Sequence, residues 1–130
     1  MRGATHYTQL TVWKLADELR VCVFDMTRRP GVSMDFARRR QLEDAIDSVC
    51  RNIAEGFGYK SDRTFAHYLQ IARASLNEVT DAIRSAMLRG HISAAEAEAA
   101  RQLASRLYPA LARFITYLRR STLRTDRRKR

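Results

Sequence analysis

The sequence has few residues of the kinds that interrupt a chain or cross-link it. Two prolines, five glycines and two cysteines occur in 130 residues, and no apolar run approaches the roughly 20 residues that span a bilayer. So few helix-breaking residues are typical of a protein built from a small number of long helices. Cys22 and Cys50 each lie in an apolar pattern, and no cleavable apolar segment follows Met1. We therefore expect a cytoplasmic protein with both thiols reduced and no membrane association, a disulfide being the less favoured alternative.

The motifs of common catalytic and metal-binding sites are also missing. The sequence has no Cys-x-x-Cys pair, no Gly-rich phosphate loop and no nucleophile elbow. The histidines His6, His67 and His91 do not converge, and no glutamate is followed three residues later by the histidine that di-metal bundles need. These absences predict that the protein is not an enzyme and requires no metal or cofactor.

One acidic cluster leaves a catalytic alternative open. Glu43, Asp44 and Asp47 follow the basic run 38–40, and carboxylates at this spacing could act as an acid–base pair or hold the magnesium ion of a nuclease. Ion pairing with arginines of this chain or of a neighbouring one is the more common use of such residues. A magnesium-dependent nuclease is therefore the weaker alternative.

Positive charge is abundant and unevenly distributed. The chain has 24 lysines and arginines against 14 acids, which gives a formal net charge of +10. Of these 24 basic residues 21 are arginines, whose planar guanidinium groups bind phosphate or carboxylate through two hydrogen bonds. More than half of the excess lies at the C-terminal end, where the candidate nucleic-acid-binding residues are Arg119, Arg120, Arg124, Arg127, Arg128, Lys129 and Arg130. This distribution predicts a polyanionic or acidic partner; the alternative is that the charge only keeps the protein soluble.

Four segments repeat apolar residues at alternating steps of three and four, which is typical of helices with one buried face. They extend over about residues 11–28, 33–57, 61–89 and 93–120. The expected inward residues are Val12, Leu15, Leu19, Cys22, Met26, Leu42, Ile46, Val49, Ile53, Phe57, Phe65, Leu69, Ala72, Leu76, Val79, Ile83, Ala86, Ala97, Ala100, Ala104, Leu107, Leu111, Phe114 and Leu118. Because only a few residues connect successive segments, the sequence predicts an all-α fold, an antiparallel up-down-up-down four-helix bundle.

Glycine, proline and capping residues predict the ends of these helices. Pro30 should end the first helix, and Gly56 and Gly58 should close the second, because glycine adopts the left-handed turn at a helix end without strain. Gly90 should end the third. The expected helix starts are Ser33 to Asp35, Ser61 or Asp62, and Ser93.

The last helix contains Pro109, whose ring removes a backbone donor and crowds the carbonyl of Ser105. The apolar pattern continues in phase beyond this proline, so we expect a kinked helix near Pro109. After Leu118 the chain is mostly basic and has little apolar surface with which to fold. We therefore expect an N-terminal extension over residues 1–10, the bundle over 11–120, and a basic, mobile tail over 121–130.

The end of the second helix places two polar residues among apolar ones. Asn52 and Glu55 lie one turn apart and are expected to satisfy backbone groups, while the small Gly56 allows close contact between helices. The functional alternative places Lys60, Arg63 and the first amides of the third helix around a phosphate.

Three stretches resemble one bacterial protein family. They are VWKLADEL at 12–19, NIAEG at 52–56 followed by YKS at 59–61, and IARASLNEV at 71–79. These look like the signature stretches of a four-helix-bundle family first met as open reading frames within intervening sequences of 23S ribosomal RNA genes. The resemblance extends from about Leu10 to about Arg119. The matching residues, which we expect to be structural, are Trp13, Asn52, Glu55, Gly56, Ser75 and Glu78.

The resemblance implies partners that residue patterns alone do not indicate. Family members form homopentamers, and they are distantly similar to the accessory variability determinant of diversity-generating retroelements, a basic pentamer that binds reverse transcriptase and nucleic acid. We therefore expect a homo-oligomer, by resemblance a pentamer. The leading hypothesis is a non-enzymatic basic bundle that binds RNA, another nucleic acid or a ribonucleoprotein through its arginines. The main alternative is a scaffold that docks an acidic protein partner.

Overall fold

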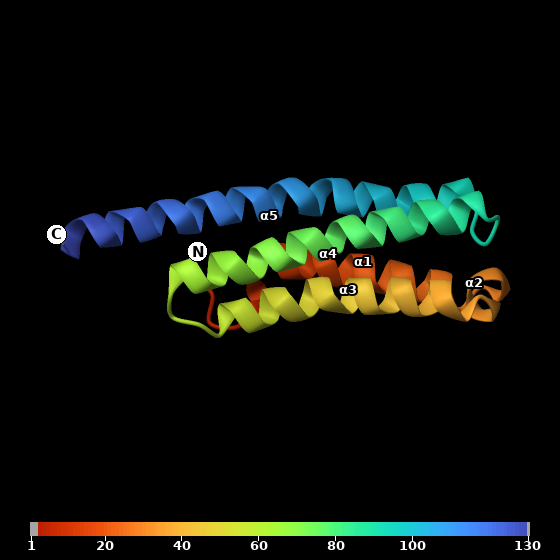
Figure 1. Cartoon of the computed structure of the whole chain (residues 1–130), viewed down its shortest axis with the longest axis horizontal. Coiled ribbons are helices and arrows are strands. Elements are labelled where there is room, and N and C mark those ends of the chain that lie inside the picture. The colour runs from red at the N-terminus through yellow and green to blue at the C-terminus, as the bar shows by residue number, and fades with distance from the viewer. Residues whose placement is uncertain (1–2, 130) are drawn as a thin grey trace.

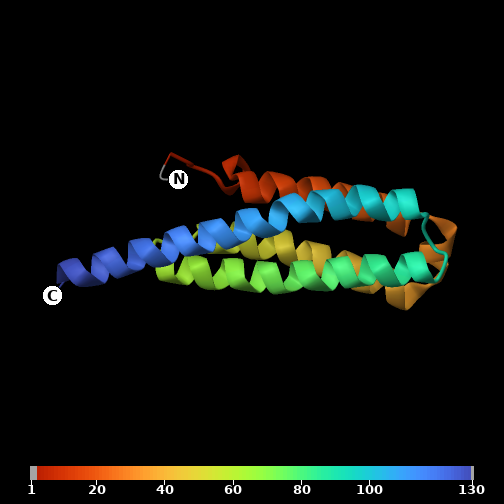
Figure 2. The ribbon, with the colours of Figure 1, turned by 90° about the horizontal axis from the view of Figure 1, so that it is seen from above.

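The computed structural model describes residues 3–129, which form one 3₁₀-helix and five α-helices. The elements are η1 (Tyr7–Gln9), α1 (Thr11–Thr27), α2 (Pro30–Met34), α3 (Phe36–Phe57), α4 (Asp62–Leu88) and α5 (Ala94–Lys129). The four long helices alternate in direction and pack side by side, and the short α2 lies at one end of the bundle (Figure 1). Helix α1 contacts α3 and α5, and α4 contacts the same two helices (Figure 2). The predicted antiparallel four-helix bundle is confirmed.

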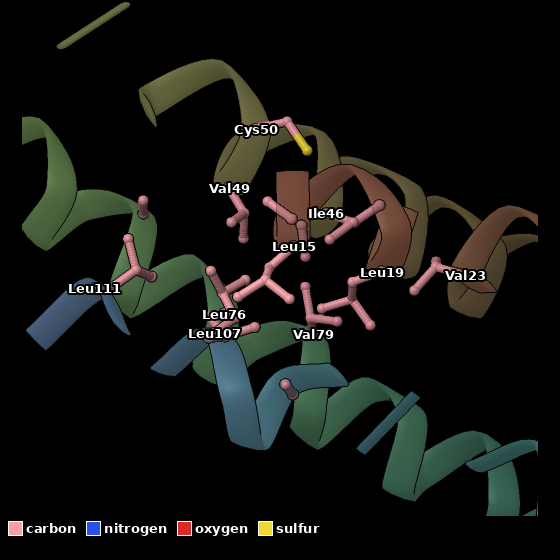
Figure 3. Packing of buried hydrophobic residues seen from close by; sticks show 14 of the residues in the cluster. Leu15, Leu19, Val23, Ile46, Val49, Cys50, Leu76, Val79, Leu107 and Leu111 are labelled. Carbon is pink, nitrogen blue, oxygen red and sulfur yellow. The ribbon is translucent and has the colours of Figure 1, made fainter. Parts of the chain in front are cut away.

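Apolar side chains from the four long helices fill the space between them. Leu15, Ile46, Leu76 and Leu107, one from each helix, gather in the core (Figure 3). The residues predicted to face inward are all buried, with the exception of two half-buried ones, Cys22 and Phe57. Leu10 is also buried, so the bundle begins within the region that we expected to be an N-terminal extension. No helix within residues 3–129 is long and apolar enough to cross a membrane.

The two cysteines are free thiols, as expected. Cys50 is buried, and this burial raises the pKa of its thiol to about 11, so the thiol stays protonated at neutral pH. Burial also raises the pKa of the half-buried Cys22. Neither thiol therefore has the lowered pKa of a reactive cysteine.

Side-chain caps begin three of the helices where the sequence predicts them. Asp35 caps α3 and Ser61 caps α4, each accepting a backbone N–H of the first turn at 3.3 Å. Ser93 and Glu96 form the two reciprocal hydrogen bonds of a capping box at the start of α5, at 3.1 and 3.2 Å. The prediction for Pro30 was incomplete. Besides following α1, it begins α2. A proline is tolerated there because the first N–H groups of a helix form no hydrogen bond within the helix.

The left-handed turn lies at Gly90, just after α4, where φ is 76°. The prediction that Gly56 and Gly58 adopt such a turn is wrong. Gly58 follows α3 with φ of −70°, and no glycine other than Gly90 has a positive φ within residues 3–129. Gly56 is needed for a different reason, which concerns the distance between helices.

Helix α5 continues without a break through Pro109. The proline is exposed, so the carbonyl of Ser105, which lacks its helical donor, lies on the side where water can reach it. Leu107 and Leu111 are both fully buried, and the apolar seam therefore stays in phase across the proline. Figure 2 shows α5 curving along its length, as expected of a helix that lacks one backbone hydrogen bond.

The region expected to be a mobile tail differs from that prediction, because α5 remains helical through Lys129. Two contacts from α4 support it. Ser121 donates a hydrogen bond to Asp62 at 2.5 Å, and Arg63 pairs with Asp126 at 2.8 Å. Cations in the last turn also interact favourably with the negative end of the helix dipole. Residues 1, 2 and 130 lie outside the described residues.

This extension of α5 can be tested by circular dichroism. A chain that ends at Arg119 should lose the helical signal of residues 120–129, because these residues continue the helix. The measurement is the ellipticity per molecule at 222 nm, compared at equal molar concentration, with thermal melting to verify that both chains fold. Equal ellipticities per molecule would show that the last residues contribute no helix.

Candidate nucleic-acid interface

One exposed face of α5 carries three arginines and a tyrosine. Arg113, Tyr117, Arg120 and Arg124 follow one another at steps of four, three and four residues, which places them on the same side of the helix. All four side chains are exposed, and together with neighbouring small residues of α5 they line a shallow groove. We call these four residues the arginine face.

The arginine face keeps its positive charge. Within residues 3–129, none of its three arginines forms an ion pair. From residue 106 to residue 129 the sequence has eight basic residues and one acid, Asp126. That acid pairs with Arg63 of α4 and does not lie on the arginine face. The face is therefore free to bind an anionic partner.

Arg119 lies on a different side of α5. It lines a groove between α4 and α5 together with Arg63, His67 and Leu123. Because Arg63 is paired with Asp126, part of the positive charge beside this groove is already neutralised. The basic residues near the C-terminus therefore form two surfaces, of which the arginine face has the more available charge.

Lys60 lies in a third hollow, at the turn between α3 and α4. Tyr59, Lys60 and Asp62 line this hollow from the turn, and Tyr117 lines it from α5. Since Tyr117 also lines the groove of the arginine face, the hollow and the groove meet at this tyrosine. The structure thus places Lys60 close to a surface that also includes Arg120 and Arg124.

Tyr59, which also lines this hollow, is held by a neighbouring tyrosine. The rings of Tyr59 and Tyr68 are stacked, with centroids 5.2 Å apart and an angle of 19° between their planes. Their hydroxyl oxygens are 3.2 Å apart, and this hydrogen bond raises the pKa of Tyr68. Tyr59 remains 47% exposed, so its outer surface is accessible while its position is restrained.

The predicted phosphate site at the start of α4 is not formed as expected. Lys60 and Arg63 line different hollows, and Arg63 is engaged by Asp126. Ser61 already accepts the N–H of Thr64, and the carboxylate of Asp62 occupies the first turn, where it disfavours a second anion. The structure therefore disfavours one phosphate site shared by Lys60 and Arg63, while their role in nucleic-acid binding stays a prediction.

The last three described basic residues extend past the bundle. Arg127, Arg128 and Lys129 are exposed on the final turn of α5, which continues beyond the ends of the neighbouring helices (Figure 1). The remaining candidate, Arg130, lies outside the described residues.

Two residues of the resembling stretches form a buried polar contact between α3 and α4. The hydroxyls of Ser75 and Ser48 are 2.7 Å apart, and Asn52 donates to the carbonyl of Ser48 at 2.8 Å and to its hydroxyl at 3.1 Å. Asn52 and Ser75 are both 7% exposed. The expected structural role is therefore supported for these two residues, because each satisfies a buried polar group.

Gly56 is buried at a close contact between α3 and α4. A Cβ atom at this position would lie 2.7 Å from the Cβ of Tyr68 and 2.9 Å from the Cδ1 of Phe65. Only glycine fits without a shift of one helix. The expectation that Gly56 permits close contact is confirmed.

The other three matching residues lie near the surface. Trp13 is half-buried, with its ring against Tyr7 at 5.4 Å and below the guanidinium of Arg20 at 5.9 Å. The side chains of Glu55 and Glu78 are exposed and make no hydrogen bond or ion pair within residues 3–129. The prediction that Glu55 satisfies a buried group is therefore wrong, since it lies outside the buried face of α3.

The acidic cluster on α3 participates in ion pairing. Asp47 lies 3.7 Å from Arg20, whose guanidinium also binds Asp17 at 2.7 Å. Among the described residues, no three His, Cys, Asp or Glu side chains gather as metal ligands would. The structural use of a carboxylate in this cluster is therefore shown for Asp47 alone.

Sequence reasoning missed Arg113 and Tyr117. Both precede the basic C-terminal stretch, which begins at Arg119. The available signal was their spacing from Arg120 and Arg124, which repeats the steps of the buried seam on the opposite side of α5.

The fold and this surface together define a basic four-helix bundle with an arginine-rich face. Residues 8–113 match the family described as 23S rRNA-intervening sequence protein. Because this match covers most of the chain, the protein belongs to that family, in agreement with the resemblance seen in its sequence. None of the curated proteins compared with the chain matches it.

The close approach at Gly56 gives a stability prediction. Replacing Gly56 with Ala should lower the free energy of unfolding by about 1–3 kcal/mol, because the added methyl overlaps Tyr68 and Phe65. Gly58→Ala is the matched control. Gly58 is exposed, its helical φ suits alanine, and an added Cβ would meet only the carbonyl oxygen of Glu55 at 3.3 Å, so the loss should be smaller than at Gly56. Urea unfolding measures both. Equal stabilities for the two variants would contradict the close packing.

Proposed function

We propose that the protein binds RNA through the arginine face of α5, as a non-enzymatic and oligomeric binding protein. The supporting observation is that Arg113, Arg120 and Arg124 share one exposed face and have no acidic partner within residues 3–129. The first and the last of these arginines are eleven positions apart on the helix. At 1.5 Å per residue they extend over roughly 16 Å. A row of this length matches a chain of phosphates better than a single one, and each guanidinium can hold a phosphate through two hydrogen bonds.

The second arginine cluster of the protein is less available. Arg38 donates to Gln41 at 2.8 Å, and the guanidinium groups of Arg39 and Arg40 lie over the ring of Phe36 at 5.3 and 5.6 Å. The acids of α3 follow directly in the sequence and reduce the local positive charge. This comparison favours α5 as the binding surface.

The family also supports RNA as the partner. Its description refers to the intervening sequences of 23S rRNA, which is a connection to RNA and not to an acidic protein. A long helix that carries eight basic residues and one acid between residues 106 and 129 has the charge distribution typical of nucleic-acid-binding surfaces.

Oligomerisation is supported by groups that have no partner within one chain. Ile71 is 36% exposed and Leu88 is 68% exposed on α4, and Val21 is 58% exposed on α1. The carboxylates of Glu55 and Glu78 are also exposed without an ion pair in residues 3–129. We propose that a homo-oligomer covers part of this surface, and the family resemblance suggests five copies.

Salt dependence tests the role of the arginine face. Replacing Arg113, Arg120 and Arg124 together with Gln should reduce the log–log salt slope of binding to a mixed-sequence single-stranded RNA by about 2. The reason is that each lost phosphate contact removes about 0.7 from the slope. Fluorescence anisotropy at several salt concentrations gives this slope.

The control for this test has the same net charge. Arg28, Arg84 and Arg89 lie at the opposite end of the bundle, near α2, and their triple replacement with Gln removes equal charge there. This control should keep most of the slope. If both triple variants lose slope equally, the binding is general attraction to a basic protein and the arginine face is not the site. If the unmodified protein does not bind RNA, a scaffold for an acidic protein becomes the better hypothesis.

The oligomeric state has its own test. Light scattering on the purified protein at micromolar concentration should give a mass several times the 15.0 kDa of one chain, and five times that mass if the family resemblance holds in this respect. A mass equal to one chain would contradict the oligomer, while leaving RNA binding by the arginine face open to its own measurement.

A further inference from the structure

We infer that the hollow beside the arginine face binds single-stranded RNA by stacking an unpaired base on the ring of Tyr117. This inference rests on the proposed function and specifies its substrate class. It assigns phosphates to the arginines of α5 and a base to the tyrosine that lies among them.

The position of Tyr117 is the first argument. Its side chain is 40% exposed, and it lies between Arg113 and Arg120 on the arginine face. The same side chain forms a wall of the hollow at the α3–α4 turn. A strand whose phosphates follow the arginines would therefore bring a base to this ring. Base stacking on aromatic side chains, beside cations that hold the backbone, is how proteins bind single strands without sequence preference.

A second tyrosine that lines the hollow, Tyr59, has a restrained ring. Tyr59 is stacked on Tyr68, and the hydroxyl pair further limits its motion. A side chain that is already ordered loses less entropy when a ligand binds. Tyr59 and Tyr117 therefore provide two aromatic surfaces to the hollow, one of which is ordered before binding.

The lining of the hollow favours a base over a phosphate, because Phe57 and Phe65 line it beside the two tyrosines. Asp62 also lines the hollow and accepts a hydrogen bond from Ser121, which holds its carboxylate in place. Lys60 lies at the same turn and is exposed, where it can meet a phosphate on the strand outside. An uncharged aromatic ring is the part of RNA that best fits a hollow with this lining.

Duplex RNA would not use this hollow. Its bases are already stacked and paired, and it presents its backbone to the protein. The arginines could hold a duplex by its phosphates, but the tyrosines would gain no base. The difference between single-stranded and double-stranded RNA therefore isolates the contribution of stacking from that of charge.

The experiment compares three variants of the full chain on two RNAs. Tyr117→Leu removes the aromatic ring but keeps an apolar side chain, and Tyr117→Phe keeps the ring. Tyr108→Leu is the matched control, because Tyr108 is on the same helix, is equally exposed at 40%, and lies beside Arg73 away from the hollow. Each is measured by fluorescence anisotropy with a mixed-sequence single strand and with the duplex of the same sequence, after circular dichroism verifies the fold.

The inference predicts a selective loss. Tyr117→Leu should weaken single-strand binding roughly ten-fold and leave duplex binding within about two-fold, since one stacked base is lost and no charge changes. Tyr117→Phe and Tyr108→Leu should bind as the unmodified protein does. If Tyr117→Leu binds the single strand normally, or loses both RNAs equally, the stacking inference is overturned while RNA binding by the arginine face stands. If the unmodified protein binds neither RNA, the proposed function fails, and the inference fails with it.

Discussion

The buried seam of α5 is the constraint on which the candidate interface depends. Small residues in its first half and large ones in its second, from Ala97 to Leu118, pack against α1 and α4 along the whole bundle. Burying this seam determines how the helix is rotated about its axis. Arg113, Tyr117 and Arg120 must then face away from the core, and α5 cannot turn them inward without exposing Leu111 and Phe114.

Contacts with α4 divide the positive charge of α5 into two parts. On the side facing α4, Asp126 pairs with Arg63, and Ser121 bonds to Asp62. These contacts extend the helix past the bundle, and they pair the only acidic residue between residues 106 and 129 with a cation of α4. The opposite side receives no acid. A basic surface on a projecting helix therefore results from the same contacts that support the end of α5.

The sequence was sufficient for the fold but not for the site. Apolar residues at steps of three and four predict each buried seam, because a buried helix face requires apolar residues at a regular spacing. Charged residues on an exposed face need no such spacing. The helical end of α5 could not be predicted from composition, since it depends on Arg63 and Asp126, which are far apart in the sequence. Gly56 was expected to permit close packing, yet the turn assigned to it was wrong. Tyr117 was missed because a surface aromatic residue becomes informative only beside Lys60 and the arginines.

The most direct test of the central claim is to map where RNA touches the protein. A mixed-sequence single strand containing 4-thiouridine can be cross-linked by ultraviolet light, and the modified peptides identified by mass spectrometry. The account predicts cross-links around Tyr117 and at the α3–α4 turn around Tyr59 and Lys60. Cross-links concentrated instead around Phe36 and the arginines that follow it, at the other end of the bundle, would contradict it.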